Sequence, residues 1–138
     1  MRTCVKTPLV ILSALALLAG CKSSPAKASF LLVDSDAVHF VQWTQEGKQI
    51  KGTIELVGIT HDNEIETTSA MFDGVLDGEN VSMATKTWGK FRGRLGRDIL
   101  TVFVDMKGEV DLRRATPAEY AEATKNFKMR AALNKGAK

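Results

Sequence analysis

The sequence has 138 residues, of which 44% are hydrophobic and 25% are charged, and its formal net charge at pH 7 is +3. Residues 1 to 20 contain Arg2 and Lys6, so without this segment the charge falls to +1, too small an excess of cations for a nucleic-acid-binding domain. The remaining chain is long enough for one domain with one hydrophobic core.

The first 20 residues have the three-part pattern of a secretory signal peptide. Arg2 and Lys6 precede the apolar run PLVILSALALL at residues 8 to 18, and the small residues Ala19 and Gly20 follow it. A helix of this run would extend only ~16 Å, whereas the hydrocarbon core of a bilayer is ~30 Å thick. We therefore predict a signal segment at 1–20 that is removed, not a permanent membrane span.

Residues 18 to 21, Leu-Ala-Gly-Cys, resemble the lipobox of bacterial lipoproteins, whose cysteine receives a diacylglyceryl group before the signal is cut in front of it. The resemblance implies that Cys21 is the lipid attachment site and the first mature residue. Two or three acyl chains on one residue hold a protein at a membrane far more firmly than one chain does. We therefore expect a bacterial cell-envelope protein, anchored in the outer membrane of a diderm host or on the outer face of the cell membrane of a monoderm host.

The body of the chain contains no further cysteine after Cys21, which excludes an internal disulfide, a thiolate nucleophile and a cysteine metal site. Residues 21–29, CKSSPAKAS, are small and polar and are predicted to form a lipidated tether. Residues 30–138 are predicted to form a single β-rich domain. Its first apolar segment, FLLVD at 30–34, is either an extra edge strand or the first strand.

From residue 38 onward the hydrophobic pattern has a period of two, which is typical of half-buried strands. Turn residues such as QEGK, LDGE and LGRD separate the apolar segments, so antiparallel neighbours joined in a meander are expected. The predicted strands lie near 38–45, 49–57, 66–76, 79–86, 89–95, 98–105 and 108–113. Two segments, FDGVLDGENVSM and FRGRLGRDILTV, both place a glycine between large inward residues, at Gly74 and Gly93, where we expect it to relieve crowding.

The last segment changes to a helical period and predicts a helix over about 116–134. Thr116 is the expected N-cap, Pro117 the first helical residue and Glu119 the partner in a capping box. The predicted buried stripe consists of Tyr120, Thr124, Phe127 and Ala131.

Three stretches of the body, FVQWTQEGKQIKGTI, SAMFDGVLDGENVSM and ATPAEYAEATKNF, resemble a group of small bacterial lipoproteins of unknown function. The likeness runs from about residue 38 to 127 and implies a meander of glycine-containing hairpins that ends in a helix. It brings no activity, cofactor or catalytic residue with it. The arginine-rich hairpin of this chain departs from the more neutral pattern of the group.

Two groups of polar residues could in principle form a metal site or a catalytic site. The loop HDNEIE contains His61, Asp62, Glu64 and Glu66, but it lacks calcium-loop spacing and offers one nitrogen where zinc takes several, so a polar turn is favoured. Serines and acids are scattered through the chain around His39 and His61, but no nucleophile elbow, phosphate-binding loop or dinucleotide-binding loop is present. We therefore predict no catalytic residue, no metal site and no cofactor.

The segment KTWGKFRGRLGR contains the candidate binding residues, which are Lys86, Trp88, Lys90, Arg92, Arg94 and Arg97. If Phe91, Gly93 and Leu95 face the core, the cations that alternate with them line one solvent-exposed strand face. Such a face can bind anionic lipid headgroups, anionic envelope polymers or an acidic partner protein. The alternative is a solvated face whose charge is balanced by acids across the sheet, such as Asp73, Asp77 and Asp105.

The sequence as a whole predicts a mainly β fold, an antiparallel meander or small barrel-like sheet of about seven strands with one C-terminal helix. The predicted function is that of a membrane-anchored, extracytoplasmic, non-catalytic binding module, present as a monomer. The alternatives are an exclusion or inhibitor lipoprotein that binds an envelope protein, and a small hydrolase.

Overall fold

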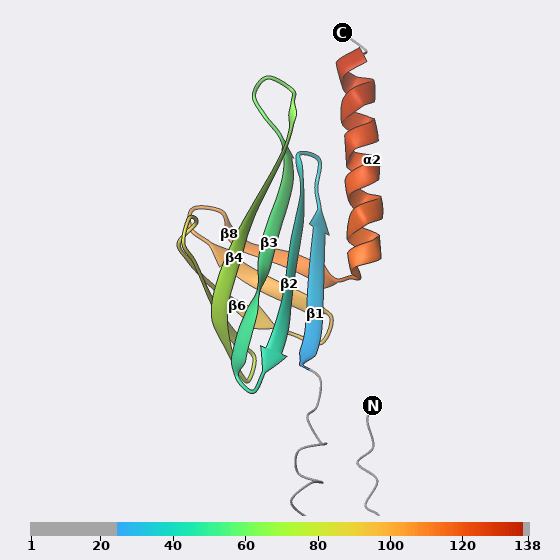
Figure 1. The fold of residues 1–138 in the computed structure, drawn as a ribbon. Coiled ribbons are helices and arrows are strands. Elements are labelled where there is room, and N and C mark those ends of the chain that lie inside the picture. Colours follow the sequence, from blue (N-terminus) through green and yellow to red (C-terminus); the bar gives the residue numbers. More distant parts are fainter. Residues whose placement is uncertain (1–24, 137–138) are drawn as a thin grey trace, which may run out of the picture.

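Residues 25–136 are described by a computed structural model, and they form a closed barrel of eight antiparallel strands with one helix outside it (Figure 1). The elements are β1 (Ala26–Val33), β2 (Ala37–Glu46), β3 (Gln49–Ile59), β4 (Ile65–Asp77), β5 (Asn80–Thr85), β6 (Lys90–Leu95), β7 (Ile99–Val104), β8 (Gly108–Arg114) and α2 (Pro117–Gly136). The predicted signal segment and Cys21 lie outside the described residues.

Each strand pairs with the next along the chain, and β1 pairs with β8 to close the barrel. The predicted mainly β, antiparallel fold with a C-terminal helix is therefore confirmed, with eight strands where about seven were expected. The additional strand is β1, which begins at Ala26, so residues 26 to 29 belong to the sheet and not to the predicted tether. Three of these four residues are small and the fourth is Lys27, so they show no clear hydrophobic alternation, but their backbone pairs with β2 from Ala26↔Gln45 onward.

The barrel interior is one hydrophobic cluster to which every strand contributes. Its aromatic centre is Trp43, whose ring centroid lies 5.1 Å from that of Phe30 and 6.5 Å from that of Phe72. The buried members are Phe30, Val41, Trp43, Ile50, Phe72, Leu76, Val81, Met83, Leu100, Val102 and Leu112. Because the domain has no disulfide to stabilise it, burial of these side chains is its main source of stability.

Inward-facing glycines allow adjacent strands to approach closely. A Cβ atom at Gly74 would lie 2.2 Å from the carbonyl oxygen of Ser82, and one at Gly93 would lie 2.5 Å from that of Thr101. Both distances are far inside van der Waals contact with backbone atoms. The prediction that these two glycines relieve crowding is thus confirmed.

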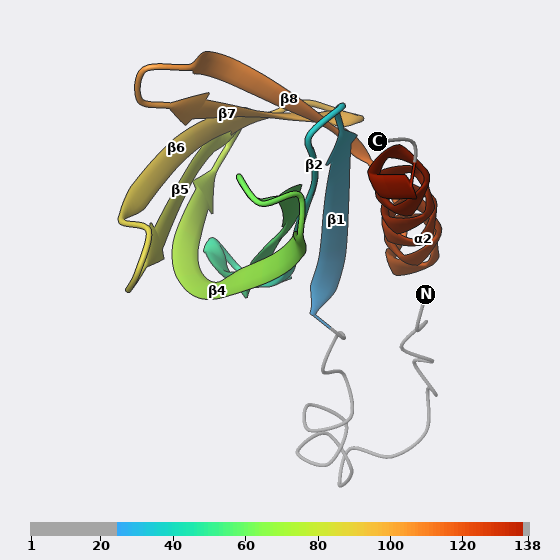
Figure 2. The ribbon, with the colours of Figure 1, turned by 90° about the horizontal axis from the view of Figure 1, so that it is seen from above.

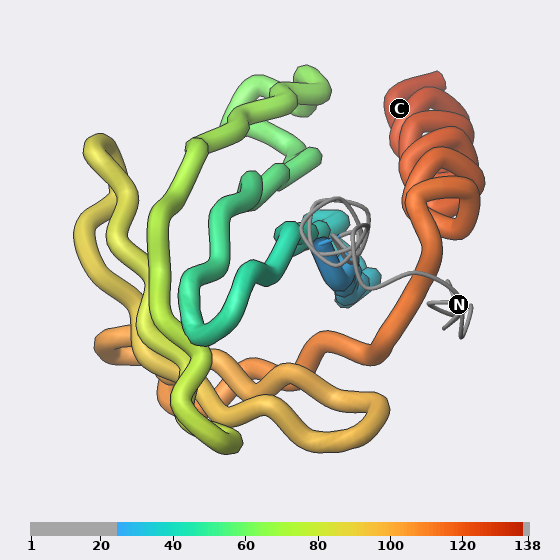
Figure 3. Tube along the Cα trace, turned by 60° about the horizontal axis from the view of Figure 1, so that its bottom comes forward, coloured from blue at the N-terminus to red at the C-terminus, as the bar shows by residue number. Residues whose placement is uncertain are grey.

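Helix α2 packs against the outer face of the first three strands, beside β1 (Figures 2 and 3). Phe127 is buried, and Tyr120, Thr124 and Ala131 are half-buried, as the predicted stripe requires. The helix thereby covers a second hydrophobic cluster, outside the barrel, whose buried members are Leu31, Val38, Phe40, Val57, Ala115 and Phe127.

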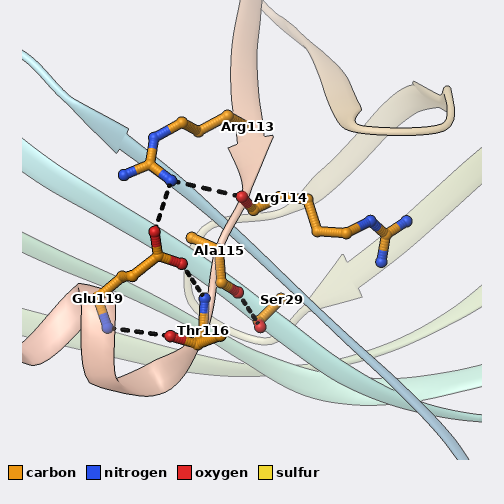
Figure 4. A network of polar contacts seen from close by, with 6 residues as sticks. All are labelled: Ser29, Arg113, Arg114, Ala115, Thr116 and Glu119. Carbon is orange, nitrogen blue, oxygen red and sulfur yellow. Dashed lines mark hydrogen bonds and ion pairs between the residues drawn. The ribbon is translucent and has the colours of Figure 1, made fainter.

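The start of α2 is joined to the strands that close the barrel (Figure 4). The N–H of Thr116 donates to Glu119 Oε2 at 2.7 Å, and the N–H of Glu119 donates to Thr116 Oγ1 at 3.2 Å, which is the predicted capping box. Arg113 of β8 forms an ion pair with Glu119 Oε1 at 3.2 Å. The hydroxyl of Ser29 in β1 donates to the carbonyl oxygen of Ala115. Strand β1, strand β8 and the helix therefore meet in one polar network.

Candidate functional site: the outer face of β5 and β6

Strand β6 points its cations away from the barrel interior. The register pairs Gly93 with Val81 on one side and with Val102 on the other, and both of these residues are buried inside the barrel. Since side chains alternate along a strand, Lys90, Arg92 and Arg94 lie on the outer face, and all three are exposed. The expected row of three cations along one solvent-exposed strand face is therefore present.

Strand β5 places small outward side chains beside this row. Ala84, Ser82 and Asn80 lie directly opposite Lys90, Arg92 and Arg94, respectively. On the other side of β5, the same three residues lie opposite Asp73, Val75 and Asp77 of β4. The outer face of β5 thus lies between a basic wall on β6 and, on β4, two acids with a valine between them.

An open groove around Arg92 has a volume of about 330 Å³. Its lining residues are Val75, Asp77, Asn80, Val81, Ser82, Arg92, Gly93 and Phe103. Val75 and Phe103 are apolar side chains that remain partly exposed on either side of the guanidinium. A guanidinium between apolar side chains is suited to a ligand that carries an anionic group next to an apolar or planar part.

The ion pairs on this face leave part of the basic wall without a carboxylate partner. Both acids of β4 form ion pairs with lysines on the β3 side of that strand. Asp73 pairs with Lys51 at 3.8 Å, and Asp77 pairs with Lys48, just before β3, at 3.0 Å.

Arg94 pairs with Glu109 at 3.9 Å, and its guanidinium carbon lies 6.0 Å from the ring centroid of Phe103. Within residues 25–136, no carboxylate oxygen lies within 4.0 Å of Lys90 or Arg92. Asp73, Asp77 and Asp105, the acids named for the solvated-face alternative, form no ion pair with this row, and the acid across the sheet that pairs with Arg94 is Glu109 of β8.

The remaining candidate residues lie at the two ends of β6. Lys86 and Trp88 belong to the turn before it, which is held by hydrogen bonds from the Trp88 N–H to Thr85 Oγ1 and from Thr85 Oγ1 to the Gly89 carbonyl. Trp88 is 37% exposed. Arg97 lies in the turn after β6, where its carbonyl oxygen accepts a hydrogen bond from Arg114. A six-residue strand is ~20 Å long, so the structure groups Lys86 and Trp88 with Lys90 and separates Arg97 from them.

Sequence reasoning missed the apolar part of the site. Val75 and Phe103 line the groove, although neither was a candidate residue. The signal is present in the sequence of β7, where Phe103 lies at an outward position of a strand whose inward positions are already apolar.

The two histidines take no part in this face. His39 Nε2 lies 3.4 Å from Asp34 Oδ2, and Asp34 also accepts the backbone N–H groups of Asp36 and Ala37. Partial burial acts to raise the pKa of Asp34, but those two amides and His39 outweigh it and the pKa is lowered. His61 lies in the exposed β3–β4 turn. Across residues 25–136, no group of three potential metal ligands is found.

No family model, no curated protein and no solved structure matches the chain. The helix found in the described part of the chain has no stretch long and apolar enough to cross a membrane.

Proposed function

We propose that this protein is a lipid-anchored lipoprotein of the bacterial cell envelope whose barrel is a non-catalytic binding module for anionic, phosphate-bearing groups. The anchor is Cys21, on the strength of the lipobox-like sequence in front of it. The binding surface is the groove along β5 and the basic wall of β6 beside it.

The binding proposal rests on the position of Arg92 and on its lack of an ion-pair partner within the described part of the chain. This side chain lines the groove between two apolar neighbours, and no carboxylate of the described residues neutralises it. Lys90 lies two residues away on the same face and is also without such a partner. An arginine presents a planar fork of N–H donors that fits phosphate and carboxylate oxygens, and a nearby lysine adds a second positive charge.

The short distance from Cys21 to the barrel supports binding close to a membrane. Strand β1 starts five residues after Cys21, a distance of at most ~18 Å of extended chain. In an up-and-down barrel, the turn after β6 lies at the end where β1 starts, so Arg97 is the candidate cation nearest to the anchor. The row Arg94, Arg92 and Lys90 then leads away from the membrane surface, where each exposed cation near anionic lipid contributes ~1 kcal/mol.

The anchor is tested by metabolic labelling with a fatty-acid analogue and by detergent partitioning. The parent chain is expected to be labelled and to enter the detergent phase, whereas Cys21→Ser is expected to be unlabelled and either soluble or uncleaved. Absence of label on the parent would refute the anchor and leave the binding face to be judged separately.

The binding face is tested with a chain of residues 25 to 138, which retains every strand of the closed barrel. We expect it to bind vesicles that contain phosphatidylglycerol and to bind soluble polyphosphate. Both interactions should weaken as salt is raised, because exposed charges are screened beyond ~10 Å at 0.1 M. Binding to both probes identifies the phosphate as the recognised group, and binding to vesicles alone identifies the lipid surface.

The decisive comparison uses two variants with the same change of charge. Lys90→Glu with Arg92→Glu is expected to lower affinity at least tenfold. Lys125→Glu with Lys128→Glu, on the exposed side of α2, is expected to leave it within about twofold. Equal binding by the two variants, or no binding by the parent, would contradict the proposal.

A further inference from the structure

Strand β4 is much longer than the strand that covers one of its edges. Its pairing with β3 is continuous from Gln49↔Val75 to Ile59↔Ile65, but its pairing with β5 stops at Phe72↔Thr85. The segment Ile65–Met71 therefore has a neighbour on one side only. Figure 1 shows the β3–β4 hairpin rising above the shorter strands.

The free side of this segment presents backbone hydrogen-bonding groups. The N–H of Leu76 donates to the carbonyl of Lys48, on the β3 side, so the even-numbered residues of β4 point their backbone groups toward β3. Because these directions alternate along an antiparallel strand, Ile65, Thr67, Ser69 and Met71 point theirs to the free side. No element within residues 25–136 pairs with that side.

The segment also lacks most of the features that normally prevent edge pairing. The uninterrupted register with β3 leaves no bulge, and the sequence IETTSAM contains no proline, lysine or arginine. Its outward side chains are mostly exposed, and Met71 is 79% exposed. An open edge of this kind, whose one charged residue is Glu66, favours the addition of another strand.

We propose that this edge binds the same edge of a second copy of the chain, antiparallel and about a two-fold axis at Thr68. This arrangement pairs Ile65 with Met71, Glu66 with Ala70, Thr67 with Ser69, and Thr68 with itself. It departs from the monomer expected from the sequence. It is independent of the basic face, which lies on the outer surface of β5 and β6.

Two features select a second copy and this register. All seven free residues overlap only when the axis passes through Thr68. That register places Met71 against Ile65 and keeps the two Glu66 carboxylates apart, each opposite Ala70.

The register is tested by oxidative cross-linking of the full chain, in which Cys4 and Cys21 are the natural cysteines. In the proposed dimer the two Thr68 positions face each other as a pair without mutual backbone hydrogen bonds, ~4.5 Å apart between Cα atoms, which suits a disulfide. The two Met71 positions are six residues apart, about 20 Å. Thr68→Cys is expected to give at least five times as much disulfide-linked dimer as Met71→Cys, after subtraction of any dimer formed by the parent.

A second pair of variants separates edge pairing from chance collision. In the Thr68→Cys background, Thr67→Lys with Ser69→Lys places four lysines side by side across the interface and is expected to lower cross-linking at least fivefold. Ala121→Lys with Asn126→Lys adds the same charge to the exposed side of α2 and is expected to change it less than twofold. Equal cross-linking of Thr68→Cys and Met71→Cys, no cross-linking of either, or equal effects of the two lysine pairs would each overturn the proposal.

Discussion

The ring of Tyr120 in α2 stacks on the ring of Phe40 in β2, with centroids 4.4 Å apart and planes 8° from parallel. Phe40 points out of the barrel, so this stack and the nearby Phe127 hold the helix against the outer wall. Burial in this contact, with the negative charge of Glu55 nearby, raises the pKa of the Tyr120 hydroxyl. The helix is therefore a packed part of the domain, although it lies outside the barrel.

We expect Phe127→Ala to lower the free energy of unfolding by ~3 kcal/mol or more, because Phe127 is 2% exposed and its removal leaves a cavity under the helix. Met129→Ala, on the exposed side of the same helix, should change it by less than ~0.5 kcal/mol. Urea denaturation followed by circular dichroism measures both values. A loss at Phe127 no larger than that at Met129 would show that the helix contributes little to stability.

Gly93→Ala is expected to destabilise the barrel severely, since the new Cβ would meet the backbone oxygen of Thr101 at 2.5 Å. Gly58→Ala is the matched control inside a strand, because its nearest contact, the Asp36 carbonyl oxygen, would be an ordinary one at 3.8 Å. Thermal unfolding of the two variants should differ widely. Similar melting temperatures would mean that β6 and β7 can separate at little cost.

Met106 lies in the β7–β8 turn with a φ of 71°, a left-handed conformation that costs a side-chain-bearing residue ~1–2 kcal/mol. Met106→Gly removes that cost but adds freedom to the unfolded chain, so a net stabilisation of about 0.5–1 kcal/mol is expected. Lys107→Gly, the neighbouring position without a positive φ, should destabilise or be neutral. A loss of stability in Met106→Gly, measured by urea denaturation, would contradict the strained turn.

The capping box predicts an acid-dependent loss of stability. The N–H of Thr116, followed by the side chain of Arg113, lowers the pKa of Glu119 below its ordinary value of 4.5. A lowered pKa in the folded state stabilises the fold above pH 4.5, and this contribution is lost as the pH falls through the folded-state value. Glu119→Gln should therefore be less stable than the parent at pH 7, and the difference should shrink toward pH 3.

The control for this experiment keeps the carboxylate and removes the other half of the capping box. Thr116→Ala should cost ~1 kcal/mol and retain the acid-dependent loss, because the backbone N–H that Glu119 accepts is still present. A Glu119→Gln effect that stays constant from pH 7 to pH 3 would show that the charge of Glu119 is unimportant.

Local patterns were sufficient to predict most of this fold. The alternation of apolar and polar residues predicted seven strands to within two residues of their observed ends, and it assigned Lys90, Arg92 and Arg94 to the outer face. The signals for the capping box and for the buried stripe of α2 are equally local, since they depend on residues three or four positions apart. These features involve neighbours in the chain, so a single sequence is enough to predict them.

Features that depend on pairing between distant segments were not predictable from the sequence alone. The groove around Arg92 exists because Ser82 of β5 stands between Val75 of β4 and Arg92 of β6. Asp73 pairs with Lys51 because of the register between β3 and β4, which no local pattern specifies. The free edge of β4 follows from the different lengths of β4 and β5 once they are aligned.

The contact between Ser29 and Ala115 joins positions 86 residues apart in the sequence. Strand β1 is among the first parts of the domain to leave the ribosome, yet its second neighbour, β8, is the last of the eight strands to be synthesised. Until then the sheet is open, with an unpaired edge and an uncovered apolar inner face, and such species are prone to aggregate. Closure is thus a late event in biosynthesis, and a chain that ends after β7 would have nearly all of its strands and still no barrel.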